Sequence, residues 1–434
     1  MKVLKKATVA AVAAASVLTF GLAGCGSSSS TSSDGRITIV AWHGFSEADG
    51  KALTKIAAQF NASQKKYTIK TELQPWTTIG EQLVTKVSTG NGPDIVTTGA
   101  DNGEGWVLDG TFQCVQDFYN TKSNETDKYR PTVTAQTKYL VKGKRQQCAV
   151  PMAYAPTVVW YNTKMWQAAG LTSNDYPKTW DQLLEVSKKL TIKGKQYGLA
   201  LSDSGWSAFI KGNGTGVYNA AGKVTVDSPK NIAFLEKMRN FYADGYSKKG
   251  MDDTAARASF ESGQSAMVIV GPWEDEAATA KGISHDLFPV PDGDGTYKYP
   301  DGTTGSNTGA AALYWWMTAQ VKDNAKKKGI YEFFKYWNNH KNQIAWSLGS
   351  AYPPNRTDVT ADELSKRPLI AKLSQYTSKA FIGFTGLKGG FGDINSEMDS
   401  ISQDTARTNK PVSTILSAAD KKITGYLNQY STQN

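Results

Sequence analysis

Along the chain, segments whose hydrophobic pattern favours a strand alternate with segments whose pattern favours a helix. Residues 36–42 carry apolar side chains at alternate positions, which is typical of a half-buried strand. The next segment repeats apolar residues at helical spacing, at Leu53, Ile56, Ala57 and Phe60. Further strands are predicted at 67–73 and 95–97, with a helix at 79–89 between them. This alternation is the signature of a parallel sheet with crossover helices, so the predicted fold class is α/β.

Ligands of parallel sheets bind outside the carboxyl ends of the strands. In this first section the rule directs attention to Trp42, to Trp76 and to residues 97–102.

A second α/β section follows. Residues 286–305 are rich in Gly, Pro and Asp and predict a hairpin region. Thr179 is suited to cap the helix that begins at Trp180. The pattern predicts strands at 148–152, 158–161, 197–201 and 266–270, and helices at 180–190, 229–244, 324–339, 343–348 and 412–430.

The first 24 residues have the organisation of a secretory signal peptide. Lysines precede an apolar run at 7–21, which is too short to span a bilayer. Residues 22–25, Leu-Ala-Gly-Cys, resemble the lipobox of bacterial lipoproteins. The resemblance implies that Cys25 is acylated and holds the mature protein on the extracytoplasmic face of the bacterial cell membrane. Residues 25–35 then form a lipid-anchored, Ser-rich linker. The alternative is an ordinary signal peptide with an incidental cysteine.

Length, charge and aromatic content narrow the range of functions that this chain can have. A mature chain of about 400 residues exceeds the size at which a single core keeps growing, so two lobes are expected. The formal net charge is +10, but Lys and Arg are scattered, whereas a nucleic-acid binder concentrates them on one element. The 12 Trp and 20 Tyr offer flat faces suited to stacking on sugars. We therefore expect no nucleic-acid partner and contact with a membrane through the lipid anchor only.

Two cysteines remain once Cys25 carries lipid, namely Cys114 and Cys148. A single pair in an exported protein favours a disulfide over two free thiols. We expect this bond to stabilise the fold and to have no redox role.

Five segments stand out in order along the chain, namely Gly92-Pro-Asp-Ile95, Val150-Pro-Met152 leading to Tyr161-Asn-Thr-Lys164, residues 177–183, residues 260–267, and Gly271-Pro-Trp273. In order and spacing they resemble the extracellular solute-binding proteins of family 1. These are the carbohydrate receptors of ATP-driven importers, which include the maltodextrin-binding protein. The resemblance implies a periplasmic-binding-protein-like fold with two lobes, a hinge between them and the ligand in the interlobe cleft. It implies residues 36–116 with 306–350 for the N-terminal lobe, and 117–305 with 351–434 for the C-terminal lobe.

Ligand contacts are inferred from the resemblance and from positions at strand ends. In the family the Trp of the Gly-Pro-Trp segment stacks on a sugar ring, which implies that role for Trp273. Asp101 falls where the maltodextrin receptor has a sugar-binding Asp, although Thr98 replaces an aromatic of that receptor. Each aromatic candidate has core packing as its alternative, and Trp180 and Asp94 are expected to be structural. The full set of candidates is Trp42, His43, Trp76, Asp101, Asn102, Tyr154, Trp206, Trp273, Asn307 and Arg356.

The expected function is a lipid-anchored, monomeric receptor that binds a carbohydrate of two or more rings and delivers it to the membrane permease of an ABC importer. No motif positions a catalytic carboxylate pair, a metal cluster or a phosphate-binding loop, so we expect no enzyme activity, no metal and no cofactor. One alternative is a lipid-anchored glycan-binding enzyme or adhesin. Another is the same fold binding a polyamine or a glycerol phosphate, which the candidate aromatics argue against.

Overall fold

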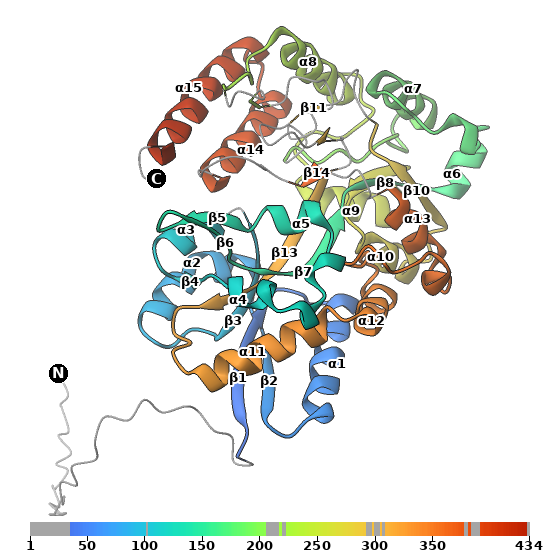
Figure 1. Ribbon diagram of the computed structural model, residues 1–434. Coiled ribbons are helices and arrows are strands. Elements are labelled where there is room, and N and C mark those ends of the chain that lie inside the picture. Colours follow the sequence, from blue (N-terminus) through green and yellow to red (C-terminus); the bar gives the residue numbers. More distant parts are fainter. Residues whose placement is uncertain are drawn as a thin grey trace, which may run out of the picture.

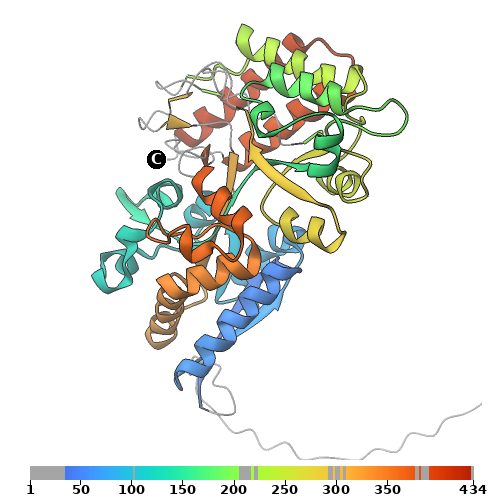
Figure 2. The ribbon, with the colours of Figure 1, turned by 90° about the vertical axis from the view of Figure 1, so that its right-hand side faces the viewer.

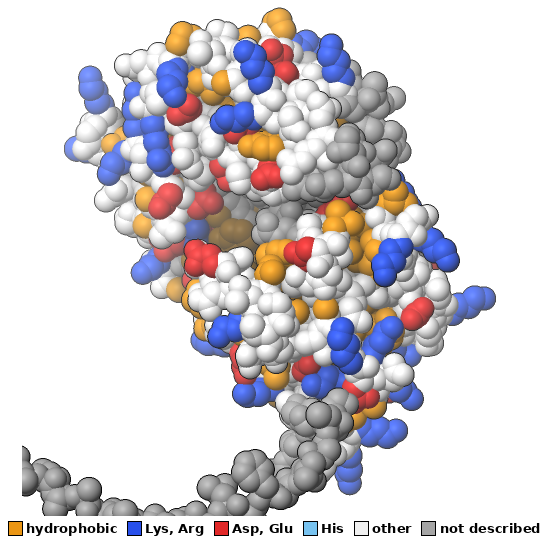
Figure 3. Space-filling model, turned by 90° about the vertical axis from the view of Figure 1, so that its left-hand side faces the viewer, with side chains coloured by type: hydrophobic (Ala, Val, Ile, Leu, Met, Phe, Trp, Pro, Cys, Tyr) orange, Lys and Arg blue, Asp and Glu red, His pale blue; other side chains and the backbone are white. Residues whose placement is uncertain are grey.

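The described residues form four β-sheets, and the two larger ones each lie in a lobe of their own (Figure 1). Figure 2 shows the same two lobes after a quarter turn, and Figure 3 shows a hollow between them. The α/β class expected from the sequence is therefore observed. The computed structural model describes residues 35–100, 103–204, 217–218, 223–291, 297–298, 304–305, 309–376, 381–382 and 391–431.

The larger sheet forms the N-terminal lobe, the lower one in Figure 1. β1 (Ile37–His43) lies between β2 (Tyr67–Leu73) and β3 (Ile95–Gly99), and both pairs are parallel. β13 (Gly309–Thr318) runs antiparallel to β3 on one side and to β7 (Val150–Pro156) on the other. The predicted parallel sheet thus exists, but a long strand that the pattern analysis did not identify joins it.

Helices cover this sheet, and α1 (Ala48–Ser63) packs against α12 (His340–Ser350) (Figure 2). Apolar residues of α1 at Leu53, Ile56, Ala57 and Phe60 are buried, as their spacing predicts. The other elements of the lobe are α1 (Ala48–Ser63), α2 (Trp76–Ser88), α3 (Gly103–Leu108), β4 (Phe112–Gln113), α4 (Gln116–Asn120), the 3-10 turns Lys122–Asn124 and Thr126–Lys128, α5 (Pro131–Ala135), β5 (Lys138–Val141), β6 (Lys144–Gln147), α11 (Asn324–Trp337) and α12 (His340–Ser350).

The smaller sheet forms the C-terminal lobe. β8 (Val158–Asn162) pairs antiparallel with both β9 (Met267–Val270) and β10 (His285–Pro289). Residues 197–201, predicted as a strand, lie beside β9 through isolated parallel bridges only. The short strand β14 (Phe381–Ile382) pairs parallel with β13 and so belongs to the larger sheet. The remaining elements are α6 (Thr163–Ala168), α7 (Trp180–Leu190), α8 (Pro229–Ala243), α9 (Asp253–Glu261), α10 (Glu274–Ala280), β11 (Tyr297–Lys298), β12 (Thr304–Gly305), the 3-10 turns Ser173–Asp175 and Asp362–Leu364, α13 (Pro368–Tyr376), α14 (Phe391–Arg407) and α15 (Val412–Ser431).

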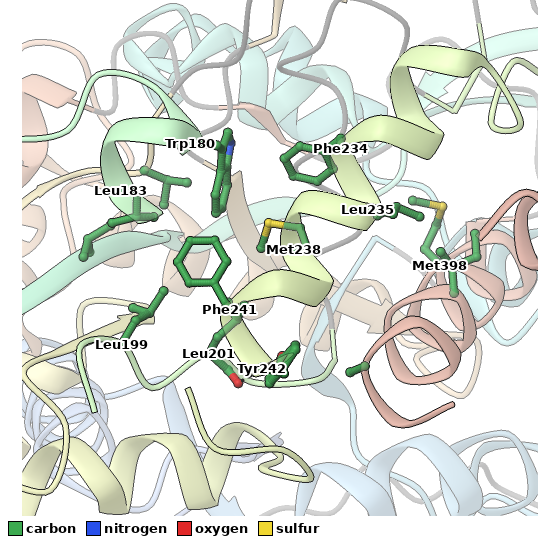
Figure 4. Packing of buried hydrophobic residues seen from close by; sticks show 14 of the residues in the cluster. Trp180, Leu183, Leu199, Leu201, Phe234, Leu235, Met238, Phe241, Tyr242 and Met398 are labelled. Atoms are coloured by element: carbon green, nitrogen blue, oxygen red, sulfur yellow. Dashed lines mark hydrogen bonds between the residues drawn. The ribbon is translucent and has the colours of Figure 1, made fainter. Parts of the chain in front are cut away.

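Trp180 belongs to the hydrophobic core of the C-terminal lobe (Figure 4). Its ring meets Phe234 of α8 edge-on, with centroids 5.3 Å apart. The helix begins as predicted, because the Thr179 hydroxyl oxygen accepts the Gln182 amide N–H at 3.2 Å. The expectation that Trp180 is structural is confirmed.

The boundary between the lobes lies elsewhere than predicted. Residues 117–156 do not belong to the C-terminal lobe, because Phe118, Tyr129 and Val150 pack in the same core cluster as Ile39 of β1. The chain first crosses between the lobes at Thr157, the one residue that separates β7 from β8. The physical reason is the pairing of β7 with β13, which keeps this segment in the larger sheet.

Cys114 and Cys148 are joined by a disulfide. The bond lies within the N-terminal lobe, and the buried Cys148 packs with the aromatic cluster around Trp316. Asp94 is also structural, as expected, since it accepts the Val40 amide at 2.9 Å and pairs with Lys326 at 3.0 Å. Within the described ranges, no helix has the length and apolarity needed to cross a membrane.

Replacing both Cys114 and Cys148 by Ser is expected to lower the free energy of unfolding by about 3–4 kcal/mol in the loop-entropy model. The physical reason is that the unfolded chain regains the freedom of the closed loop, while the native contacts remain. Urea denaturation monitored by circular dichroism measures the change. Unchanged unfolding of the double variant would contradict a stabilising disulfide.

Candidate functional site

Five strands end at the hollow between the lobes. In the N-terminal lobe β1, β2 and β3 are parallel, and Gly99 at the end of β3 lies opposite Leu313 of β13. In the C-terminal lobe, Val270 of β9 and Pro289 of β10 both pair with Val158, which directly follows the crossing. Carboxyl ends of strands from both sheets therefore meet at the interlobe face. Figure 3 shows hydrophobic side chains in the hollow and acidic side chains at its rim.

Trp76 presents an indole at the ends of β1 and β2. It is the first residue of α2, which begins three residues earlier than predicted, and 42% of its surface is exposed. The ring lies directly over Gly44, where a Cβ atom would overlap it, so this contact requires glycine. Phe45 supports the indole edge-on at a centroid distance of 5.3 Å. The indole is thus held in position while much of it stays accessible.

Trp273 presents a second indole at the end of β9. Its ring folds back over Gly271, where a Cβ atom would again overlap it. The Gly271 carbonyl oxygen accepts the Trp160 indole N–H at 3.1 Å, which anchors the strand end. Trp273 is only partly buried and packs against core clusters of both lobes. It is a C-terminal-lobe side chain that reaches the N-terminal lobe.

Tyr352 connects the two aromatic groups. Its ring centroid lies 6.1 Å from that of Trp273 and 6.1 Å from that of Phe45. Its hydroxyl donates to the Asp49 carboxylate at 3.4 Å. Burial raises the pKa of Tyr352 well above its usual range, and burial also raises the pKa of Asp49. The contact between the lobes therefore contains the protonated phenol of Tyr352 beside a carboxyl oxygen of Asp49.

Glu274 follows Trp273 and is fully buried. Its Oε2 accepts the Arg257 guanidinium Nε–H at 3.0 Å, while its Oε1 is buried without a hydrogen-bond partner. Burial raises the pKa of Glu274 to about 7 although Arg257 opposes the rise. Arg257 also contacts Glu261 at 3.4 Å, so this cation is shared by two carboxylates.

Two other polar side chains are buried at the strand ends without full hydrogen bonding. His43, the last residue of β1, has a buried Nδ1 with no partner, and burial lowers its pKa. Glu104, in the first turn of α3, has a buried Oε2 with no partner, and burial raises its pKa to about 8. The cause is the same for both groups, namely the loss of water around the charged form.

Three predicted ligand residues are enclosed by the protein instead of lining the hollow. Trp42 is buried, and its indole N–H donates to Glu72 at 3.0 Å. Tyr154 is fully buried, with the Arg130 guanidinium 5.5 Å from its ring centroid. Arg356 is 2% exposed and holds Asp358 in a two-pronged ion pair at 2.8 and 2.6 Å. In this structure neither Tyr154 nor Arg356 offers a ligand the contact predicted for it.

The remaining predicted residues, Asp101, Asn102, Trp206, Asn307 and Cys25, lie outside the described residues. Conversely, the sequence analysis did not select Phe45, Asp49, Glu104 or Tyr352. Proximity to the end of the first predicted strand was a usable signal for Phe45. Among the described residues, no group of three or more His, Cys, Asp or Glu side chains is suited to hold a metal ion.

Sequence comparison connects this geometry to a known family. The family model for bacterial extracellular solute-binding proteins matches residues 44–344. The sn-glycerol-3-phosphate-binding periplasmic protein UgpB of Brucella melitensis is 24% identical over 348 residues, which covers 72% of this chain and 73% of that protein. The galactooligosaccharide-binding protein of Bacillus subtilis is 28% identical over 313 residues, which covers 67% of this chain and 69% of that protein.

Solved structures share the fold. The GacH receptor of Streptomyces glaucescens, known unliganded and in complex with acarbose, matches with a TM-score of 0.75 at 19% identity, over 91% of this chain and 99% of that one. UgpB from Mycobacterium tuberculosis, in complex with glycerophosphocholine, matches with a TM-score of 0.74 at 18% identity, over 90% and 98% of the two chains. The expected two-lobed binding-protein fold is confirmed.

Gly44→Ala is expected to displace the Trp76 indole, because the added Cβ overlaps the ring. The measurement is 19F NMR of protein labelled with fluorotryptophan, with the Trp76 resonance assigned from a Trp76→Phe variant. We expect a shifted or broadened Trp76 signal.

Gly80→Ala in α2 is the matched control, since no atom lies within 4 Å of the position its Cβ would take. It is expected to leave the Trp76 signal unchanged and to stabilise the helix by about 1 kcal/mol. An unshifted Trp76 signal in Gly44→Ala would contradict the described indole position.

Proposed function

Because the chain belongs to the bacterial extracellular solute-binding protein family, we propose that it is the lipid-anchored receptor of an ABC importer and that its ligand is an oligosaccharide. The observation that carries the ligand class is the pair of indoles, Trp76 from one lobe and Trp273 from the other, at strand ends that meet at the hollow. Flat apolar faces with polar groups around them suit sugar rings, whose C–H faces are apolar and whose edges carry hydroxyls.

Closure of the hollow is the proposed mechanism of capture. The lobes are joined at Thr157 between β7 and β8, and each contributes one indole, so a rotation of the lobes changes the distance between Trp76 and Trp273. A ligand favours the closed form only through contacts that it makes better there. A sugar that stacks on both indoles meets this condition. The receptor closes around the sugar, and the permease then meets the closed receptor.

Relatives support this proposal and also a second candidate. The galactooligosaccharide-binding protein supports a sugar, while the two UgpB proteins support a glycerol phosphate or its diester. All of these relatives are binding proteins, which supports a receptor without enzyme activity.

A calorimetric screen of protein that begins at Gly35 distinguishes an oligosaccharide ligand from a glycerol phosphate ligand. The panel contains galactooligosaccharides, maltodextrins, sn-glycerol 3-phosphate and glycerophosphocholine, and chromatography of each mixture detects cleavage. Saturable binding of an oligosaccharide without product supports the proposal. Product release would identify a glycan-binding enzyme and overturn it.

Trp273→Ala is expected to weaken oligosaccharide binding by one to two decades. A ring-sized apolar contact of roughly 100 Å² contributes about 2–3 kcal/mol, and each decade in affinity corresponds to about 1.4 kcal/mol. Calorimetry with the sugar found in the screen measures the change. Affinity equal to that of the unsubstituted protein would show that Trp273 does not contact the ligand.

Trp180→Ala is the control for this variant, because Trp180 lies in the core of the C-terminal lobe, where Figure 4 shows it beside Phe234. It is expected to lower the melting temperature while the folded fraction binds sugar normally.

Cys25→Ala is expected to release the protein from membranes without affecting sugar binding. The proposed acyl chains hold the protein by burying methylene groups, at about 0.8 kcal/mol each, and an alanine accepts no acyl chain. Fractionation of cells followed by immunoblotting measures the distribution. A variant that remains membrane-bound after a high-salt wash would refute the lipid anchor.

A further inference from the structure

His285 has a hydrogen-bond acceptor beside each of its two ring nitrogens. It is the first residue of β10, where its Nδ1 lies 2.8 Å from the Ile283 carbonyl oxygen and its Nε2 lies 3.1 Å from Oδ1 of Asp275. Carbonyl and carboxylate oxygens only accept, so each ring nitrogen needs a hydrogen to bond its partner. A neutral imidazole carries a single N–H, and only the charged imidazolium therefore satisfies both contacts.

Asp275 links His285 to a second cation. Its Oδ2 accepts an N–H of the Arg367 guanidinium at 3.3 Å, while its Oδ1 faces His285. Arg367 directly precedes α13 and also pairs with Glu276, the next residue of α10. The side chains of His285 and Asp275 are 7% and 14% exposed, so salt screens their attraction little. This network therefore ties the first turn of α10 to β10 and to the start of α13.

Other charged groups near His285 come from β10 itself and from the elements that pack against it, namely β8, α6, α10 and α13. They are Glu274 with its partner Arg257, Asp286 with its partner Lys372, and the exposed Lys164. Each of these carboxylates is paired with a cation, which leaves Asp275 as the carboxylate that contacts the ring. Burial acts to lower the pKa of His285, but the contacts with Asp275 and the Ile283 carbonyl oxygen raise it above the ordinary 6.5.

Two routes connect His285 with the Trp273 indole. Trp273 is the residue before α10, and Asp275 lies in the first turn of that helix. The second route is the Trp160 ring, whose centroid lies 5.7 Å from that of His285 and whose indole N–H donates to the Gly271 carbonyl oxygen at 3.1 Å. Gly271 is the residue on which the Trp273 ring lies. Groups that contact His285 therefore hold both the backbone of Trp273 and the surface beneath its ring.

We propose that charged His285 is a positioning residue for Trp273 and that it makes ligand affinity depend on pH. Loss of the proton removes one of the two hydrogen bonds of the ring and leaves a nitrogen lone pair facing the Asp275 carboxylate, which weakens the attachment of the first turn of α10. An indole that is held less firmly must be ordered when the ligand binds, and affinity falls. The inference rests on the proposed function, because it requires that Trp273 contact the sugar.

Calorimetry between about pH 5.5 and 8.5 tests the pH dependence, with the maltodextrins and galactooligosaccharides of the screen as uncharged probes. Because the pKa of His285 is raised, affinity is expected to be highest below pH 6.5 and to weaken roughly three- to tenfold as the pH rises through the folded pKa. His285→Gln keeps an N–H for Asp275 but does not titrate, so it is expected to lack this decrease. Glu274, with a pKa of about 7, titrates in both proteins, so the difference between them isolates His285.

NMR of the histidine rings measures the same coupling in the unsubstituted protein. The chain has three histidines, and the signal that disappears in His285→Gln assigns this ring. Should that variant fail to fold, His43→Gln and His340→Gln assign the signal by elimination. If protonation favours binding, binding favours protonation equally, so saturating sugar is expected to raise the pKa of His285 by the logarithm of the same roughly three- to tenfold factor. A residue with a structural role alone gives no such change.

His340→Gln is the matched control for the pH profile. The His340 ring also contacts an acid, Glu363 at 2.7 Å, but His340 lies on α12 and its contact does not involve α10. This variant is expected to keep the pH dependence of the unsubstituted protein.

The outcomes separate this inference from the proposed function. A pKa of His285 that does not rise when sugar binds would overturn the inference, while the receptor function would stand. The same holds for a His285→Gln variant whose affinity follows the pH profile of the unsubstituted protein. Binding of sn-glycerol 3-phosphate or glycerophosphocholine and of no neutral sugar would instead overturn the proposed ligand class, and the inference with it.

Discussion

The antiparallel pairing of β13 with β7 is the constraint on which the arrangement of both lobes depends. β7 continues into β8 after the single residue Thr157, so the strand that completes the larger sheet leads directly into the smaller one. The opposite edge of β13 pairs with β3, which aligns the parallel strands of the N-terminal lobe with this crossing. The carboxyl ends of strands in both lobes therefore lie at one interface, and the hollow forms there.

Two contacts between an indole and a glycine give this interface its apolar faces. Trp76 lies over Gly44 and Trp273 over Gly271, and in both cases a Cβ atom would overlap the ring. A large side chain packed on bare backbone loses rotational freedom when the protein folds, before any ligand arrives. Because that cost is not incurred again on binding, a preorganised indole contributes more of its contact energy to affinity.

The same packing determines the electrostatics. Burial raises the pKa of Glu104 to about 8 and that of Glu274 to about 7, although an arginine opposes the rise at each. A cleft rich in acids thereby carries less negative charge at pH 7 than its composition suggests.

Much of this fold was determined locally and was readable from the sequence. The predicted strand at 67–73 and helix at 180–190 coincide with β2 and α7, because each depends on its own periodicity and cap. The core position of Trp180 follows from the helix start at Thr179, and the structural role of Asp94 from the Gly-Pro turn before it. The pair Cys114 and Cys148 was predictable because an exported chain with two remaining cysteines favours a disulfide. Residue order alone also directed attention to Trp76 and Trp273 at strand ends.

Only the tertiary structure decided which side chains reach the hollow. Tyr154 and Arg356 occupy plausible positions in the sequence, yet one is enclosed by the core and the other by an ion pair with Asp358. The lobe boundary depended on β13, whose partners β3 and β7 are more than 150 residues away in the chain, so no local pattern assigns residues 117–156 to a lobe. Burial, hydrogen bonding and the pKa of Glu104 arise from such long-range contacts, which periodicity and composition do not encode.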